Sequence, residues 1–403
     1  MNVLFWISSF PSYSETFIRN QVINLIDHNI NVLIYTNNKD SSQSSSLDNL
    51  ESYGLLERVT SKNELYHTNK VIRVLIAFKI LLGSLFTKNF KFYLKSLNSK
   101  RYGNAAKSLK HFYFISYLLK NKIDVIHAHY GPNGNDAAVY KEIGLPVKLI
   151  CTFHGYDIRL GDKKPKIFYN ILFKYADKII SISDYNYNKL IGFGLAKNKL
   201  VSINNGVRLG DDDARVERDN DVIKILSVGR LVEDKAIDLA LKALHKLHKD
   251  YPQIQWQYDI IGDGELENAL KELTEEFKLT SKVKFHLYQD SNYVKSMMNT
   301  SDFLLLTSVN EALPTVILEA QALKLPVIAT NVGSVSNLVI DNHTGFLVEP
   351  NVDSIYEGLV KLIENKEKWE DYGINGHRIV EENYDEKKEI IKLIDLYKTW
   401  YNG

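Results

Sequence analysis

Two glutamates eight residues apart, Glu311 and Glu319, follow an apolar run and flank a proline. Pro314 fits the first turn of a helix, where its missing N–H loses no partner, and it disfavours helical geometry at Leu313. The pattern predicts a strand, a loop that carries Glu311, and a helix that carries Glu319. A helix N-terminus attracts anions such as phosphate, and carboxylates accept hydrogen bonds from sugar and ribose hydroxyls. The alternative is a capped helix with two solvated acids.

A second candidate site begins where another apolar run ends, at Gly229. Arg230 and Lys235 follow it, five positions apart. Loops at the carboxyl ends of parallel strands are where α/β sheets bind ligands. A guanidinium fork and an ammonium group together neutralise a diphosphate, both bound and as it leaves. The alternative is an ordinary charged loop between a strand and a helix.

Polar residues also end two predicted strands in the first half of the chain. His127 and His129 alternate onto one face of a strand, and His154 precedes a glycine at the end of the next. We expect His154 to contact a ligand and His129 to serve the acceptor side. Ser14 and Glu15 lie at the first turn after a strand, where they could cap the following helix and stabilise its first turn, and could equally contact a bound acceptor. A metal pair at His127 and His129 is disfavoured because no third ligand accompanies it.

Two further patterns imitate known motifs and are given less weight. Gly262 and Gly264 follow a strand, but the third glycine of a dinucleotide fingerprint is missing, which disfavours a nicotinamide cofactor. Asp211 and Asp213 form a D-x-D pair of the kind that holds a metal on a nucleotide-sugar. Their place in a polar stretch away from any strand end favours a solvated linker.

Short apolar runs alternate with helical patterns along the whole chain, which is typical of parallel strands joined by helices. We predict two doubly wound α/β domains, residues 1–207 and 222–384, facing each other across a cleft. The charged stretch 208–221 is the predicted linker, and 385–403 the predicted terminal helix, packing back toward the first domain. The predicted strands are residues 3–7, 31–35, 125–127, 147–152, 178–183, 200–203, 223–228, 256–261, 282–286, 302–306 and 327–330.

The composition of the 403 residues is ordinary for a soluble protein, with a net charge of +1. This balance indicates no nucleic-acid partner. A single cysteine, Cys151, excludes an internal disulfide and favours a reducing, cytoplasmic compartment. The most apolar segment, residues 71–86, contains Arg73 and Lys79, which disfavours a membrane-spanning helix.

One region departs from this balance, because no Asp or Glu occurs between Leu65 and Ile123. It is rich in aromatic and aliphatic residues and contains many cations, which predicts basic amphipathic helices that lie on anionic lipid headgroups. The alternative is ordinary surface helices. The cations are Lys70, Arg73, Lys79, Lys88, Lys91, Lys95, Lys100, Arg101, Lys107, Lys110, Lys120 and Lys122.

Together these segments resemble the retaining glycosyltransferases of family 4, which have the GT-B fold. The resemblance rests on six segments in the family's order: F-P-S-Y-S-E-T-F-I at 10–18, H-A-H-Y-G at 127–131, F-H-G-Y-D at 153–157, N-G-V at 205–207, V-G-R-L at 228–231, and the E-x7-E pair Glu311 and Glu319. The first and third of these are similar to the subgroup that builds bacterial exopolysaccharide, capsule and colanic-acid-type repeat units on lipid carriers.

The resemblance implies a role for each matching residue. Arg230 and Lys235, with Gly229 beside them, would bind the nucleotide diphosphate and stabilise it as a leaving group. Glu319 would hold the ribose hydroxyls, and His154 would lie under the donor sugar near the reacting carbon.

Glu311, with the backbone N–H groups of Ala312 and Leu313, would hold the hydroxyls of the transferred sugar. The resemblance further implies front-face displacement, in which the leaving oxygen takes the proton of the acceptor hydroxyl. It implies neither a metal nor a cofactor.

The chain departs from the family pattern at four positions. Ala312 and Ala236 stand where glycines are usual, and Asn337 stands where a glutamate is usual after a double glycine. Leu287 replaces the glycine of a turn that lies by the base. The base is therefore open, with a UDP-sugar favoured over a GDP-sugar.

The sequence thus predicts a metal-independent retaining glycosyltransferase on the inner face of the cell membrane, with a lipid-linked or polysaccharide acceptor. Two alternatives stay open. One is a GT-B enzyme with a small soluble acceptor, and the other is a catalytically silent protein that binds nucleotide-sugars.

Overall fold

The computed structural model describes residues 1–12, 15–39, 50–209 and 221–400. Residue contacts divide the chain into two compact units. Unit 1 contains Met1–Ile182, Asn186–Ile203 and the described residues from Lys392 onward, and unit 2 contains Ser183–Tyr185 and Asn204–Ile391. Most of the predicted linker, with Asp211 and Asp213, lies outside the described residues. Each unit is described by itself below.

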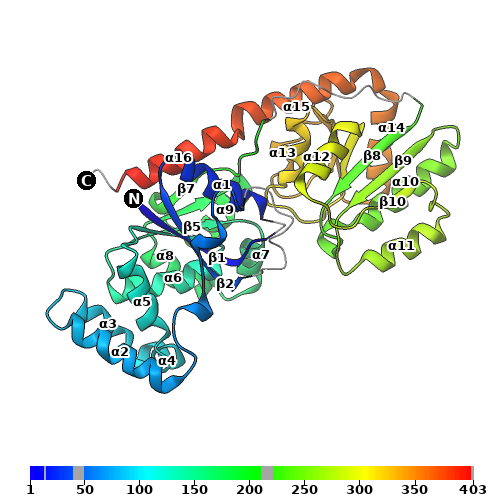
Figure 1. Ribbon diagram of the computed structural model, residues 1–403. Coiled ribbons are helices and arrows are strands. Elements are labelled where there is room, and N and C mark those ends of the chain that lie inside the picture. The colour runs from blue at the N-terminus through cyan, green and yellow to red at the C-terminus, as the bar shows by residue number, and fades with distance from the viewer. Residues whose placement is uncertain (13–14, 40–49, 210–220, 401–403) are drawn as a thin grey trace. The chain divides into compact units, whose positions relative to one another are not determined.

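Unit 1 is built on a parallel seven-stranded sheet in the order β3-β2-β1-β4-β5-β6-β7. Figure 1 shows its helices beside this sheet. The strands are β1 (Asn2–Phe10), β2 (Asn31–Lys39), β3 (Val59–Ser61), β4 (Val125–His129), β5 (Lys148–Phe153), β6 (Lys178–Ser181) and β7 (Leu200–Ser202). The α-helices are α1 (Thr16–Asp27), α2 (Lys70–Ser84), α3 (Phe90–Ser96), α4 (Ser99–Lys107), α5 (Lys110–Lys120), α6 (Gly131–Ile143), α7 (Tyr156–Lys163), α8 (Asn170–Tyr175) and α9 (Asp184–Gly192).

Unit 2 is built on a parallel six-stranded sheet in the order β10-β9-β8-β11-β12-β13. The strands are β8 (Ile223–Val228), β9 (Trp256–Ile261), β10 (Val283–Phe285), β11 (Phe303–Leu306), β12 (Val327–Thr330) and β13 (Gly345–Val348). The α-helices are α10 (Ile237–Asp250), α11 (Glu267–Glu276), α12 (Ser291–Thr300), α13 (Thr315–Ala322), α14 (Val352–Glu364), α15 (Trp369–Asn383) and α16 (Glu386–Lys398). Helix α16 ends among the residues of unit 1.

Strands β11 and β12 are almost entirely apolar, as is typical of parallel strands that helices cover on both faces. All four residues of β11 and of β12 are buried. In unit 2 a polar link at the strand ends adds to this core: Ser227 donates to the backbone oxygen of Leu305, and Tyr258 donates to Ser227. These bonds fix β8, β9 and β11 relative to one another just before the loops that leave them.

The two-domain α/β architecture is confirmed, and each predicted strand is present with small shifts at its ends. Two strands were not predicted. β3 and β13 have three and four residues and lie at sheet edges, where a short run carries little signal. Helix α13 begins at Thr315, so Pro314 precedes the first turn instead of lying within it.

Candidate active site

The strand order of unit 2 reverses between β8 and β11, which are hydrogen-bonded neighbours. At such a switch point the loops leaving the two strands turn to opposite sides, and a crevice opens beyond their carboxyl ends. The loop after β8 carries Gly229, Arg230 and Lys235, and the loop after β11 carries Glu311. The fold therefore brings together two segments that lie some eighty residues apart in the sequence.

Lys235 and Glu311 form an ion pair at this switch point. The Nζ atom of Lys235 lies 2.5 Å from Oε1 of Glu311, and Ser308 donates to the same oxygen at 2.8 Å. The two side chains are 21% and 11% exposed. Among the described residues, nothing donates to the second oxygen, Oε2, so Glu311 keeps an acceptor for a ligand.

Backbone hydrogen bonds hold the loops around this pair in place. Val309 N–H donates to the carbonyl of Asp234 at 2.9 Å, and the Thr307 hydroxyl donates to that of Ala236 at 2.9 Å. Gly333 approaches so closely that a Cβ would lie 1.8 Å from the carbonyl oxygen of Glu311, and its φ of 59° also favours glycine. The loop with Glu311 is thus fixed on both sides.

The backbone between Glu311 and α13 offers donors to a ligand. Ala312 and Leu313 are each 7% exposed, and their N–H groups have no hydrogen-bond acceptor among the described residues. No side chain caps α13. Buried N–H groups are almost always paired, so this stretch has the character of an anion or hydroxyl-oxygen site.

Glu319 lies on α13 and is only partly accessible. Burial raises the pKa of its carboxyl group from 4.5 to about 7. Within the described parts of the chain this carboxyl group has neither a hydrogen bond nor an ion pair. A partly buried carboxylate without a protein partner is suited to a ligand that donates hydrogen bonds.

Arg230 and Gly229 complete the loop after β8. Arg230 is exposed, and no carboxylate of the described residues pairs with it. Gly229 lies beside the stem of Lys235, where an added Cβ would be 3.5 Å from the lysine Cε. One cation at this loop is thus held by Glu311, and the other is accessible to a ligand.

The structure shows the backbone conformation or position of each residue that departs from the family pattern. Ala236 and Leu287 adopt φ angles of 45° and 54°, so both keep a left-handed backbone without glycine. The carbonyl of Leu287 also accepts from Gly262 N–H at 2.7 Å. Ala312 does not have a positive φ, so its methyl group causes no such strain. Asn337 ends a short 3-10 helix, Val335–Asn337.

Two of the predicted acceptor residues, Glu15 and His129, lie in unit 1 beside the point where the strand order reverses between β1 and β4. Glu15 directly precedes α1 and accepts a hydrogen bond from the Tyr130 hydroxyl at 2.8 Å. Burial raises the pKa of Glu15, and this hydrogen bond opposes the rise. Ser14, the other acceptor residue predicted before α1, lies outside the described residues.

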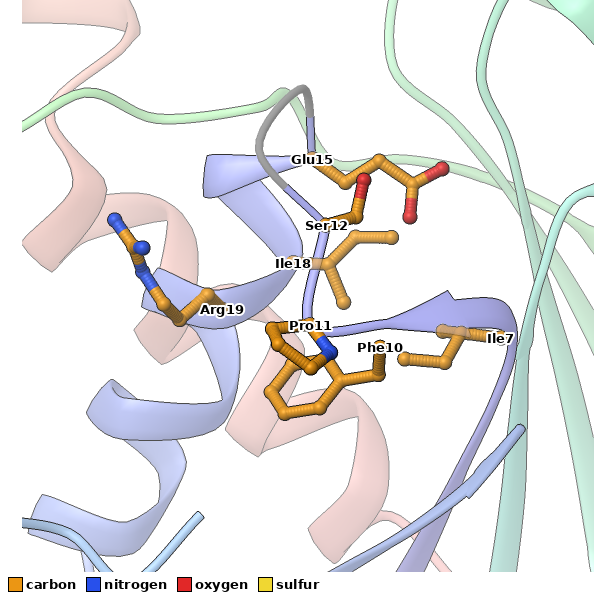
Figure 2. Close-up of a pocket in the computed structure, with 7 residues that line it drawn as sticks. All are labelled: Ile7, Phe10, Pro11, Ser12, Glu15, Ile18 and Arg19. Carbon is orange, nitrogen blue, oxygen red and sulfur yellow. The ribbon is translucent and has the colours of Figure 1, made fainter. Parts of the chain in front are cut away.

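Glu15 also lines a small pocket with Ile7, Phe10, Pro11, Ser12, Ile18 and Arg19. Figure 2 shows the carboxylate of Glu15, just before α1, and the guanidinium of Arg19, on α1, extending in opposite directions. Most of the residues that line the pocket are apolar.

The three histidines form one buried cluster in unit 1. His127 and His129 are stacked with their ring centroids 4.5 Å apart, as strand alternation predicts, and His129 is stacked on His154 at 5.3 Å. His129 Nδ1 and His154 Nε2 are 3.1 Å apart. Burial lowers the pKa of His127 and of His154 to about 3 and that of His129 well below its usual range, so all three rings are neutral.

Within the described parts of the chain, two ring nitrogens of this cluster are left without a hydrogen-bond partner. His129 Nε2 and His154 Nδ1 have no partner among the described residues, although both atoms are buried. By contrast, His127 contacts the Tyr397 hydroxyl at 2.6 Å and the Thr152 hydroxyl at 2.7 Å. Both nitrogens of His127 are thus satisfied, which makes its role structural.

Sequence reasoning missed the residues that hold these histidines. Tyr397 lies on α16, 270 residues away from His127 in the sequence, so no local sequence pattern predicts the contact. Asp157, from the F-H-G-Y-D segment, is buried and accepts hydrogen bonds from the N–H groups of Gly131, His154 and Ile158. Burial raises its pKa to about 7 against these donors. Its place as the first acid after His154 could have signalled a helix-start role.

The structure thus forms two groups of site residues. The predicted donor residues lie on segments that follow the carboxyl ends of strands in unit 2. His129, His154 and Glu15 lie at or just after the carboxyl ends of strands in unit 1. In the described ranges, no three His, Cys, Asp or Glu residues are arranged to hold a metal ion. The same ranges contain no helix long and apolar enough to cross a membrane.

Solved structures share this architecture. A UDP complex of Alr3699/HepE from Anabaena superposes with a TM-score of 0.72 at 16% identity, covering 99% of this chain and 100% of that one. Sucrose-phosphate synthase from Thermosynechococcus elongatus gives 0.74 at 17% identity, covering 100% and 99%. The two sheets accordingly define the GT-B class of fold, as predicted.

Sequence comparison narrows the class to a family. Residues 91–211 match Glycosyltransferase Family 4, and residues 211–378 match Glycosyl transferases group 1. The putative colanic acid biosynthesis glycosyltransferase WcaL of Escherichia coli K12 is 30% identical over 368 residues, 87% of each chain. The amylovoran biosynthesis glycosyltransferase AmsK of Erwinia amylovora is 26% identical over 387 residues, 91% of each. The chain belongs to the family 4 glycosyltransferases, and the predicted resemblance is confirmed.

Replacing Glu319 by Gln should stabilise the protein at high pH. A folded-state pKa of about 7, above the ordinary 4.5, means that stability falls as the pH rises between these values and stays reduced above 7. Relative to the wild type, Glu319→Gln should raise the free energy of unfolding by up to about 3 kcal/mol at pH 8 and change it little at pH 4.5. Urea unfolding at both pH values measures this.

The exposed helical Glu357→Gln controls for the substitution itself. An equal effect of Glu319→Gln at both pH values would show that its carboxyl group is not strained by burial.

Replacing Leu287 by Gly should also stabilise the protein. The left-handed backbone costs an L-residue about 1–2 kcal/mol, and the greater freedom of glycine in the unfolded chain offsets about half of that. We expect the free energy of unfolding to rise by up to about 1 kcal/mol. Lys284→Gly, on the neighbouring strand β10 without a positive φ, should lower it by about 0.5–1 kcal/mol. A destabilised Leu287→Gly would indicate that the leucine side chain makes a contact that outweighs the strain.

Proposed function

We propose that this glycosyltransferase moves a sugar, with retention and without a metal, from a nucleotide-diphosphate-sugar to a lipid-linked or polysaccharide acceptor. The reaction would serve surface-polysaccharide biosynthesis at the inner, cytoplasmic face of the cell membrane. The observation that carries the proposal is the Lys235–Glu311 pair at the switch point, with an exposed arginine and unpaired N–H groups beside it.

The chemistry of these groups divides one ligand among them. Arg230 and Lys235 supply positive charge for a diphosphate, which grows more negative as it leaves. The free oxygen of Glu311 and the N–H groups of Ala312 and Leu313 suit the hydroxyls of a sugar. Glu319 lacks a protein partner, and two vicinal ribose hydroxyls would provide donors for it.

The acceptor would use the groups of unit 1. Glu15 lines a small pocket, and His129 and His154 each have one nitrogen without a partner among the described residues. In the proposed step, the oxygen of the acceptor hydroxyl bonds to the anomeric carbon as the bond to the diphosphate breaks. The leaving phosphate oxygen takes the hydroxyl proton, so no side-chain base is required, and catalysis consists of positioning and charge stabilisation.

Related proteins support the wider role. WcaL, AmsK and the Staphylococcus aureus protein CapM are described as acting in colanic acid, amylovoran and capsular polysaccharide biosynthesis. Structures of Alr3699/HepE contain UDP and UDP-glucose. These relatives favour a polymer-building role and a UDP-sugar, whereas a small soluble acceptor and a silent binding protein are the competing hypotheses.

Removing either member of the Lys235–Glu311 pair should abolish transfer while the fold persists. In Glu311→Ala the hydroxyls of the donor sugar lose a hydrogen-bond acceptor, and Lys235 loses the carboxylate that holds it in place. In Lys235→Ala the leaving diphosphate loses a positive charge that stabilises it. We expect kcat to fall about a hundred- to a thousandfold in each, consistent with the loss of one preorganised group. Radiolabelled sugar transfer to a membrane-extracted acceptor is the assay, and the anomeric configuration of the product tests retention.

The control is an ion pair of equal N–O distance elsewhere in unit 2. Lys271 and Glu267 on α11 are also 2.5 Å apart, and Glu267→Ala should retain full activity. Wild-type turnover in Glu311→Ala would remove this pair from the site.

A thermal-shift panel of nucleotides should identify the donor class. A ligand that binds only the folded state raises the melting temperature in proportion to the logarithm of its concentration over its Kd. UDP and UDP-sugars should stabilise the wild type more than GDP and GDP-sugars do, and Arg230→Ala should reduce the UDP shift. A larger shift with GDP would reverse the donor assignment, and a UDP shift without any donor turnover would favour the silent binding protein.

A further inference from the structure

Helix α2 presents an apolar stripe to solvent. Val71, Leu75, Phe78, Leu82 and Leu85 recur at spacings of four and three residues, so they lie on one face of the helix. Their side chains are 68%, 63%, 59%, 48% and 43% exposed. In an ordinary surface helix this face would be turned toward the core.

The opposite face of α2 attaches the helix to unit 1. Ala77 and Ser84 are its buried residues, and the Tyr113 hydroxyl of α5 donates to the carbonyl of Arg73. Helix α2 packs on α3, which in turn packs on α5 and α6. Figure 1 shows α2, in blue, with α3 and α4 at the outer side of α5. The fully buried residues of α2 are therefore small, whereas most of its large apolar residues are exposed.

This stripe is part of a larger exposed apolar surface, which we call the α2 surface. Ten of the seventeen exposed large hydrophobic residues of the described chain fall between Val71 and Leu94. A contiguous apolar patch on a soluble protein marks an interaction site. Besides the stripe, the α2 surface contains Ile72, Val74, Ile76, Phe86 and Leu94.

The charged residues in the segment that carries the α2 surface are all cations. Lys70, Lys79, Lys88 and Lys91 are exposed on or beside α2, and the sequence has no acid from Leu65 to Ile123. If a second copy of the chain docked here, the lysines of the two copies would repel one another. An apolar face bordered by cations complements a bilayer, which has an acyl interior below anionic headgroups.

We propose that α2 lies parallel to the surface of an anionic membrane and inserts its apolar stripe into the boundary between the headgroups and the acyl chains. A helix of fifteen residues is too short to span a bilayer, but it can bury one face about 5–10 Å deep. This inference deepens the proposed function by naming the surface that brings the enzyme to a lipid-linked acceptor. It differs from purely electrostatic docking, because apolar insertion persists when salt screens the lysines.

The first test is sedimentation of the full chain with vesicles containing phosphatidylcholine and 30 mol% phosphatidylglycerol. The wild type should bind, and should keep a substantial bound fraction at 0.5 M salt. Leu75→Gln/Phe78→Gln/Leu82→Gln should lower the partition coefficient at least tenfold, and the exposed positions and helix-tolerant glutamine leave the fold intact. Ile374→Gln/Ile391→Gln removes two exposed helical isoleucines of α15 and α16 and should bind as the wild type does.

A second readout reports insertion directly. The single native cysteine, Cys151, is buried, so Leu75→Cys can be labelled selectively with an environment-sensitive fluorophore. Its emission should shift to the blue with vesicles, whereas that of labelled Ile374→Cys should not. Absence of a shift, or complete release by salt, would overturn insertion. Dimerisation without vesicle binding, abolished by the triple glutamine variant, would assign the α2 surface to a second copy.

Neither readout uses a sugar donor, so this inference and the proposed function fail independently. Vesicle binding without transfer activity would count against the proposed function alone, and transfer to a detergent-dispersed acceptor without vesicle binding would count against the inference alone.

Discussion

The ion pair between Lys235 and Glu311 depends on one topological fact, the pairing of β8 with β11. Only at that reversal of strand order do the two loops meet. Bringing two charges into a half-buried crevice costs solvation, and such a pair is a weak source of stability. We propose that it instead holds the lysine and the glutamate in position until a diphosphate and a sugar form hydrogen bonds with them. Gly333 and the bonds from Thr307 and Val309 serve the same end, because they fix the loops that carry the pair.

Two buried carboxyl groups show how the surroundings separate a structural acid from a ligand-facing one. Burial raises the pKa of Asp157 and of Glu319 to about 7 in each case. Asp157 accepts three backbone N–H groups and thereby shapes the turn that holds His154. Glu319 has no such donors among the described residues. The same titration shift thus accompanies a satisfied acid in one unit and an unsatisfied acid in the other, and only the second calls for a ligand.

Local pattern predicted the parts of this structure that depend on local chemistry. The strand, loop and helix around Glu311 and Glu319 are present, and alternation placed His127 and His129 on one face. Contacts between distant segments were beyond it, as with Tyr397 on His127. The left-handed backbone at Ala236 and Leu287 was also hidden, because neither residue type signals a positive φ. Periodicity likewise reveals that α2 has an apolar face, but not that this face turns outward.

The most direct test of the account is a crystal structure of the protein with an unhydrolysable UDP-sugar. We expect the diphosphate to lie within hydrogen-bonding distance of Arg230 and Lys235. The ribose hydroxyls should contact Glu319, and the sugar hydroxyls should contact Glu311 and the N–H groups of Ala312 and Leu313. A nucleotide bound away from the switch point of β8 and β11, or a diphosphate that leaves the Lys235–Glu311 pair untouched, would contradict it.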